Sequence, residues 1–336
     1  MAATTPVGIL NLKQLEYFVR VAELGSFSRA ALVLDIAQPA LSRQVRLLET
    51  DLRVNLLTRT GRGVVLTDAG KRLFDHSVGI LQLVARAAED LSAARDEPSG
   101  RVVVGLPPSI GRLLTLPLVK AFVDDLPQAR LAIVEGLSTH LAEWIATGRV
   151  DLGLLHNPEP NPALEITPVL EEPLGLVSPI VRAGAGGRGA PREEEAAAPA
   201  GKRVRTPPLL RLQDLSRFPL IVPDRAHAIR KLLEAQAALA GVKLDVAWEV
   251  SSVQAILDLV RAGYGHAVLA RTALVASGQP EAFGLRPLAA AGLTSTLCLA
   301  VSAHRPATPL IRRTLGMIRD LLATAPAVRA GHNRLR

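Results

Sequence analysis

The chain of 336 residues contains a single cysteine, Cys298, which excludes an internal disulfide. No apolar run reaches the length of about 20 residues that a membrane-spanning helix needs, and residues 1–11 lack a basic region followed by a long apolar run. No cluster of cysteine or histidine has the spacing of a structural zinc site. We therefore expect a protein of a reducing compartment, the cytoplasm, without membrane insertion and without a structural metal.

The motifs of common catalytic sites are missing as well. The sequence has no GxSxG, no HExxH and no P-loop, and its histidines are scattered without partners at a useful spacing. Residues 184–189 formally spell GxGxxG, but no helix of packed apolar residues follows them. They lie in a run, 182–208, whose alanine, glycine, proline and charge predict a disordered insertion, with glutamates 193–195 as a solvated charge run. We expect no enzyme and no cofactor.

The composition permits two or three folded domains, because 49% of the residues are hydrophobic and the chain is long enough for several cores. The net charge of +8 favours a polyanionic partner. Many basic proteins never bind nucleic acid, however, so the position of the charge is more informative than its total.

The segment from Ser26 to Gly70 has the pattern of two short helices followed by a basic hairpin. Ser26 or Ser28 can cap the first helix, and Pro39 suits the start of the second. In the second helix an apolar stripe faces inward and a polar, arginine-bearing face points outward, as in a helix that reads the major groove. Strands at 56–59 and 63–66 form the hairpin. The residues predicted to contact DNA are Ser28, Gln38, Pro39, Ala40, Ser42, Arg43, Arg46, Arg53, Arg59, Thr60 and Arg62.

Helix pairs of this spacing also occur in plain helical domains, and a face with arginines is often only solvated. The whole string nevertheless resembles the N-terminal winged helix-turn-helix of LysR-type transcriptional regulators. The resemblance rests on residues 26–31 (SFSRAA), 38–44 (QPALSRQ), 59–63 (RTGRG) and 66–70 (LTDAG). Ala37 departs from the usual capping Ser or Thr, at a cost of about 1 kcal/mol, and Leu57 replaces the usual Phe.

A long helix is predicted from Thr67 to about residue 95, with a heptad seam at Leu73, Ser77, Ile80, Val84, Ala87 and Leu91. The alternative is an amphipathic helix that lies on its own domain. Charged and helix-breaking residues at 96–100 end it and predict a hinge. The resemblance to the LysR family implies that this linker helix pairs two subunits, commonly within a tetramer, and presents two DNA-binding domains to a dyad-symmetric site.

From residue 101 onward, predicted strands alternate with predicted helices, which indicates two α/β lobes with parallel sheets covered on both faces and joined by crossing strands. This region resembles the LysR effector domain, which is similar to periplasmic solute-binding proteins, and residues 105–109 (GLPPS) resemble regulators of the nitrogen-assimilation type. The fold class is thus α/β with an all-α winged helix-turn-helix N-terminal domain, a long linker helix and a two-lobed effector domain. The predicted domains are 1–66 for DNA binding, 67–97 for the linker, and 98–330 for the effector (lobe I about 101–170 and 282–325, lobe II about 171–281).

Ligands of open α/β sheets bind beyond the carboxyl ends of strands, where helices begin. Serine and threonine at such places are often only helix caps, a lone arginine is often only solvated, and a lone histidine is often structural. As a set they favour a ligand site in the cleft, and Arg112 or His156 can supply a positive charge for a carboxylate. The candidate effector-binding residues are Ser109, Arg112, Ser138, Thr139, His156, Ser251 and Ser252.

Together these patterns predict a sequence-specific transcriptional regulator that binds double-stranded promoter DNA and is controlled by a small-molecule effector. RNA polymerase is a candidate further partner, and a homodimer or homotetramer is expected. The alternative is a small-molecule-binding or catalytic α/β protein that merely carries a helical N-terminal domain. Sequence-specific retardation of DNA that weakens steeply with salt separates the two.

Overall fold

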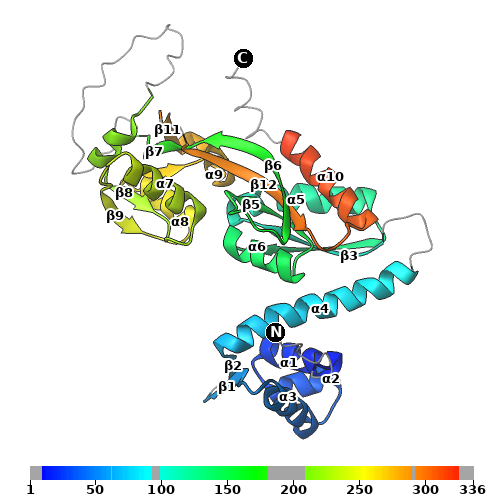
Figure 1. Cartoon of the computed structure of the whole chain (residues 1–336). Helices are drawn as coiled ribbons and strands as arrows, with labels where there is room; N and C mark the ends of the chain where they lie inside the picture. Colours follow the sequence, from blue (N-terminus) through cyan, green and yellow to red (C-terminus); the bar gives the residue numbers. More distant parts are fainter. Residues whose placement is uncertain (1–9, 62, 93–98, 181–208, 290–291, 325–336) are drawn as a thin grey trace, which may run out of the picture.

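The computed structural model describes residues 10–61, 63–92, 99–180, 209–289 and 292–324. It has three parts: a small N-terminal domain, one long helix, and a two-lobed α/β domain (Figure 1). Arg62, the predicted insertion at 182–208 with its GxGxxG run and glutamates, and most of the predicted hinge lie outside the described residues. No described helix is long and apolar enough to cross a membrane.

The N-terminal domain is a bundle of α1 (Leu12–Leu24), α2 (Phe27–Leu34) and α3 (Gln38–Leu52). Its buried apolar residues, among them Phe18, Leu41 and Leu48, form two adjoining clusters. The predicted cap of α2 is confirmed, because the Ser26 side chain accepts from the Arg29 amide. The hairpin follows as β1 (Leu57–Thr60) and β2 (Gly63–Leu66), paired antiparallel.

The linker helix α4 (Asp68–Ser92) begins as predicted after Thr67, whose hydroxyl accepts from the Gly70 amide at 3.0 Å. Leu73 and Ile80 of the predicted heptad seam pack, partly buried, against the core of the N-terminal domain. Val84 of the same predicted seam and its neighbour Leu83 are about half exposed, at 45% and 50%. The linker thus combines the two alternatives that the periodicity left open: one part lies on its own domain, and an apolar stretch further along remains uncovered.

Lobe I has a five-stranded sheet of order β4-β3-β5-β12-β6 between two helical layers. Helices α5 and α10 share one buried cluster with strand residues, and α6 packs into another through Leu141 and Ile145. The elements are β3 (Gly100–Leu106), α5 (Pro108–Asp125), β4 (Ala129–Glu135), α6 (Ser138–Thr147), β5 (Leu152–His156), β6 (Leu164–Pro173), β12 (Thr294–Ser302) and α10 (Pro309–Thr324).

Lobe II is built on a second sheet, in which β7 lies between β10 and β11, and β8 pairs with β9. An isolated bridge between Leu220 and His266 joins the two pieces. The elements are β7 (Gly175–Pro179), η2 (Leu212–Arg217), β8 (Leu220–Val222), α7 (Ala228–Leu239), β9 (Val246–Glu249), α8 (Val253–Arg261), β10 (Ala267–Leu269), α9 (Arg271–Ala276), η3 (Pro280–Ala282) and β11 (Phe283–Pro287).

The sheets are mixed, which corrects the expectation of parallel sheets. Strands β3, β4 and β5 are parallel, but β12 runs antiparallel to both β5 and β6, and β7 is antiparallel to both its neighbours. The chain crosses between the lobes along β6–β7 and back along β12, without a helical crossover (Figure 1). Strand β6 was not predicted from the sequence, because it contains Pro168. An edge strand tolerates a proline, and here Pro168 pairs with Cys298 beside a register shift.

Candidate DNA-binding surface and effector cavity

Helix α3 buries one face and exposes the other. Leu41, Val45 and Leu48 are fully buried in the domain core. On the opposite side Ser42 is half-buried, and the other described residues of the predicted DNA-binding set are exposed. Those exposed residues are Ser28, Gln38, Pro39, Ala40, Arg43, Arg46, Arg53, Arg59 and Thr60.

Local contacts hold α3 although its N-terminus lacks a side-chain cap. Ala37 is the N-cap residue and its side chain accepts no hydrogen bond, as the sequence predicted. At the other end Glu49 accepts from the backbone amides of Leu56 and Leu57 at 2.8 and 3.1 Å. This carboxylate therefore ties the helix to the start of the hairpin, which sets the hairpin's direction relative to the exposed face of α3.

The hairpin is anchored on the turn between α1 and α2. The Val64 amide donates to the carbonyl oxygen of Gly25 at 3.0 Å. A β-carbon on Gly63 would overlap that same oxygen, and Gly63 has a φ of +142°, so only glycine fits here without displacement. The hairpin tip, with Arg59 and Thr60 exposed, consequently projects from the domain at a fixed place.

The exposed face is positively charged and its arginines are not held in ion pairs. Among the described residues, no carboxylate forms an ion pair with Arg43, Arg46, Arg53 or Arg59. A guanidinium that is exposed and unpaired can bind a phosphate or the edge of a guanine without first breaking another contact. This surface therefore has the shape and charge that recognition of duplex DNA requires.

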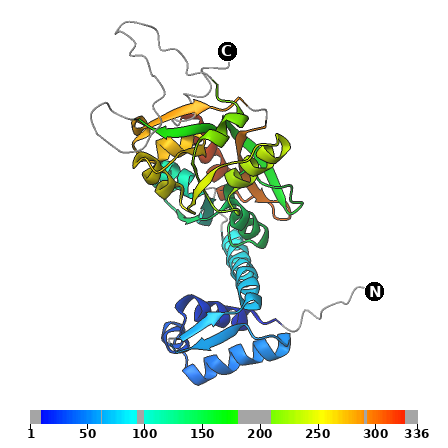
Figure 2. The ribbon, with the colours of Figure 1, turned by 90° about the vertical axis from the view of Figure 1, so that its left-hand side faces the viewer.

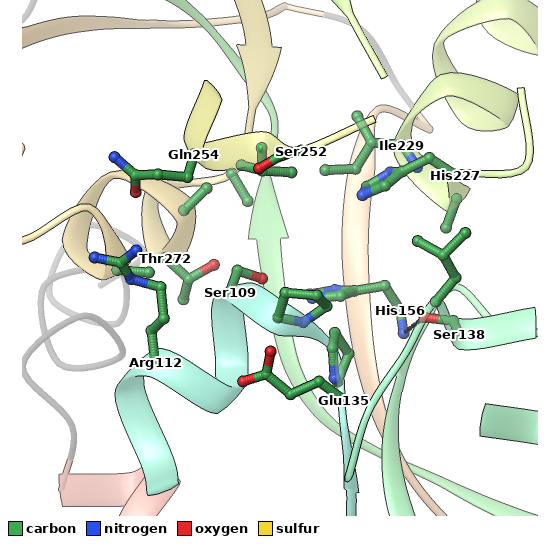
Figure 3. A pocket seen from close by; sticks show the side chains of 18 of the residues that line it. Ser109, Arg112, Glu135, Ser138, His156, His227, Ile229, Ser252, Gln254 and Thr272 are labelled. Atoms are coloured by element: carbon green, nitrogen blue, oxygen red, sulfur yellow. Dashed lines mark hydrogen bonds between the residues drawn. The ribbon is translucent and has the colours of Figure 1, made fainter. Parts of the chain in front are cut away.

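A cavity of about 480 Å³ lies between the two lobes (Figure 3). Five helices turn their first residues toward it: α5 and α6 from lobe I, and α7, α8 and α9 from lobe II. Helix N-termini carry partial positive charge, so their convergence favours an anionic ligand, although the amides of Ile229, Ala255 and Thr272 already donate to groups of this chain.

Most of the predicted effector residues line this cavity. Thr139 does not: it follows Ser138 by about 100° around α6, and its side chain lies outside the cavity lining. Several lining residues were not predicted, and of these Thr272 lies in α9, a helix of only six residues whose start was not recognised. The predicted residues that line the cavity are Ser109, Arg112, Ser138, His156, Ser251 and Ser252, and those that were missed include Glu135, His227, Gln254 and Thr272.

The two histidines of the cavity, one from each lobe, are neutral at neutral pH. Burial, with a smaller contribution from the repulsion between the protonated forms of His156 and His227, lowers the pKa of His156 to about 4. Burial also lowers the pKa of His227, whose ring nitrogen caps α7 by accepting from the Ile229 amide at 3.3 Å. The expectation that His156 supplies a positive charge is therefore wrong. Among the described lining residues that charge comes from Arg112.

The hydroxyl groups of the cavity are used to different degrees. Ser138 accepts from the backbone amide of His156 at 2.9 Å, and Ser252 caps α8 by accepting from the Ala255 amide at 3.4 Å. Within the described residues the Ser109 hydroxyl has no hydrogen-bond partner. All three can still donate their proton, because each acts as an acceptor or is free.

Thr272 connects the cavity to the strand that crosses between the lobes. Its amide and hydroxyl donate to the buried carboxyl group of Glu172 on β6, at 3.1 and 2.6 Å. Burial raises the pKa of Glu172, against the opposing effect of these hydrogen bonds. The start of α9 is thereby fixed to the crossing strand at the edge of the ligand cavity.

The N-terminal domain is a winged helix-turn-helix with an exposed basic face. A helix joins it to a two-lobed domain with a cavity between the lobes, as in solute-binding proteins. This combination is typical of a DNA-binding regulator. Comparison with known families agrees. The model of the bacterial regulatory helix-turn-helix protein, lysR family, matches residues 12–71, and that of the LysR substrate binding domain matches residues 95–323. The chain belongs to the LysR family of DNA-binding transcriptional regulators.

Individual relatives are similar over most of their length. The nitrogen assimilation regulatory protein nac of Klebsiella aerogenes is 29% identical over 265 residues, which is 79% of either chain. Among solved structures, a full-length OxyR variant from Pseudomonas aeruginosa has a TM-score of 0.65 at 22% identity, over 95% of this chain and 97% of that one. Full-length CbnR complexed with its target DNA has a TM-score of 0.62 at 22% identity, over 93% and 100%. These two structures show the same fold.

Proposed function

We propose that the protein is a cytoplasmic regulator, not an enzyme, that reads promoter DNA with the outward face of α3 and grips the phosphate backbone with the hairpin. The observation that carries this proposal is the exposed, unpaired face of α3 from Gln38 to Arg46, opposite a fully buried apolar face. The complex of full-length CbnR with its target DNA supports it. Arg53, Arg59, Thr60 and Arg62 are assigned to backbone contacts.

The proposed assembly is a homodimer or homotetramer in which α4 contributes to pairing. The support is the uncovered apolar stretch of α4 around Leu83 and Val84, since large apolar side chains in a helix that joins two domains favour a partner. Val84 belongs to the heptad seam that the sequence predicted, so the proposed pairing uses the later part of that seam. Two DNA-binding domains related by a dyad would read two half-sites of an inverted repeat.

Selection of duplexes from a random pool tests the DNA-binding part. The expected result is an inverted repeat whose affinity for the protein falls by about 10³- to 10⁵-fold between about 50 and about 200 mM salt, as for proteins that neutralise several phosphates. Recovery of unrelated duplexes with a shallow dependence on salt would instead support the alternative of an α/β protein with an incidental helical domain.

The cavity is proposed to bind a small anionic effector. The N-termini of α5, α6, α7 and α8, the Arg112 guanidinium and the hydroxyl groups of Ser109, Ser138 and Ser252 support an anion. The one carboxylate of the described lining, Glu135, and the neutral His156 and His227 favour an additional polar group on that ligand. Such a ligand can change transcription only if it binds two arrangements of the protein with different affinity.

A screen of small carboxylates and phosphate esters by thermal shift tests this site. For any compound that binds, Arg112→Ala is expected to lower affinity by about 10-fold or more, because a hydrogen bond to a charged group is lost. Thr139→Ala, which changes a neighbouring residue outside the cavity, is the matched control and should bind as the wild type does. Equal affinity of the Arg112 variant and the wild type would remove this arginine from the site.

A further inference from the structure

The linker helix is held against the effector domain of the same chain, at the C-terminal end of α6 (Figures 1 and 2). Arg149, just after α6, forms an ion pair with Asp75 of α4 at 2.6 Å, and both side chains are largely covered, at 32% and 18% exposure. The same guanidinium lies 4.2 Å from the centre of the Trp144 ring and 5.6 Å from that of Phe74. We call Phe74, Asp75, Trp144 and Arg149 the Arg149 clamp.

The backbones of the two helices also meet without intervening side chains. A β-carbon on Gly79 of α4 would overlap the carbonyl oxygen of Thr147, the last residue of α6. With its amide oriented to satisfy both ends, Gln82 donates to the carbonyl oxygens of Gly148 and Arg149 at 2.7 and 3.1 Å. Gly79 lets the two backbones approach closely, and the Gln82 amide binds two carbonyl oxygens just beyond the end of α6. The contact between α4 and α6 is therefore specific.

The other end of α6 lies at the ligand cavity. Leu137 and Ser138 line the cavity, and the body of the helix is fixed to the sheet of lobe I through buried Leu141 and Ile145. Ten helical residues span about 15 Å, so the cavity and the clamp are at opposite ends of one rigid element.

We propose that the Arg149 clamp docks α4, and the DNA-binding domain packed on it, onto lobe I as a single body. A change at the cavity that moves lobe I relative to lobe II then moves the DNA-binding domain with lobe I. Coupling of this kind is reciprocal, so DNA binding must also affect the cavity. The coupling between the cavity and DNA binding rests on the proposed function. The docking of α4 on lobe I can be measured without DNA or effector.

Two variants test the docking from opposite sides of the contact. Gly79→Ala favours the helical state of α4 itself, because alanine is the better helix former, yet places a methyl group against Thr147. Gly316→Ala in α10 is the matched control, since its β-carbon would meet nothing within 4 Å. Arg149→Gln breaks the clamp from the effector domain and leaves the surface of α4 unchanged.

The first readout is amide hydrogen exchange of the free full-length protein. In Gly79→Ala and in Arg149→Gln, exchange in residues 79–85 is expected to accelerate at least tenfold, while α1–α3 and the Gly316→Ala protein exchange as the wild type does. Because Gly79→Ala strengthens the helix, faster exchange there reports undocking and not weaker helix propensity. Unchanged exchange of residues 79–85 in both variants would overturn the proposal.

The second readout uses the selected duplex as the probe. In the wild type and in Gly316→Ala, saturating duplex is expected to alter exchange in residues 136–141 at the cavity by at least threefold, and in the two clamp variants this response should disappear. An equal response in all four proteins, or none in the wild type despite bound duplex, contradicts coupling through the clamp. Absence of DNA binding in every protein would refute the proposed function, and the first readout would still decide the docking.

Discussion

Replacing Arg43 by alanine is expected to lower affinity for the selected duplex by about 5- to 150-fold per half-site and to relax base preference at one position in each half-site. Arg43 is exposed on the outward face of α3, where a guanidinium can form two hydrogen bonds with guanine. Their loss corresponds to about 1–3 kcal/mol. Competitive binding of the variant to a panel of single-base changes of the selected duplex measures both effects.

Arg59→Ala is the matched control for this prediction, because Arg59 has the same charge and is also exposed but lies on the hairpin. A phosphate contact carries no sequence information, so its loss should weaken all duplexes about equally and reduce the salt slope by about one per subunit. The base-reading assignment fails if Arg43→Ala keeps the full wild-type preference at every position, or if both variants change the preference alike.

Acidification is expected to destabilise the effector domain through His156. The folded pKa of about 4 lies below the ordinary value of 6.5, so between these values the unfolded chain binds the proton and the folded protein does not. The stability is therefore complete above about pH 6.5 and declines as the pH falls toward about 4. From about pH 7.5 to about pH 5.0 the expected loss in the free energy of unfolding is about 2 kcal/mol.

Urea unfolding of wild type and His156→Gln at the two pH values measures this effect. Glutamine does not titrate, so the variant should lose about 2 kcal/mol less than the wild type on acidification. Burial also lowers the pKa values of His227 and His266, and their contribution to the pH dependence of unfolding remains in both proteins. A variant with the same pH dependence as the wild type would show that His156 is not the titrating group.

The DNA-binding domain could be predicted from sequence almost residue by residue. Its signals are local: the cap at Ser26, the proline near the start of α3, the apolar spacing of Leu41, Val45 and Leu48. The packing partner of the linker helix was harder to predict, because an apolar stripe along a helix does not show which surface it packs against. Leu73 and Ile80 fit a subunit seam by spacing, but they pack, partly buried, against the N-terminal domain of the same chain.

The effector cavity could be predicted only in part. Ser109, Ser138 and His156 were found because each lies at or just after the end of a recognisable strand, and such positions gather at one edge of a sheet. Thr272 was missed because a six-residue helix has too few residues to show a period. The neutral state of His156 was missed as well, because burial sets the pKa and the sequence does not show how completely a side chain is buried.

The sequence alone determined the family, the helix-turn-helix, the exposed basic face of α3 and the alternation of strands and helices, because these depend on residues a few positions apart. Tertiary structure alone decided the mixed strand directions, the closing of five helix N-termini around one cavity, and the docking of α4 on α6. The Arg149 clamp joins residues 74 positions apart. Contacts of that separation follow from how whole elements pack, and packing depends on the complete set of buried surfaces rather than on any local pattern.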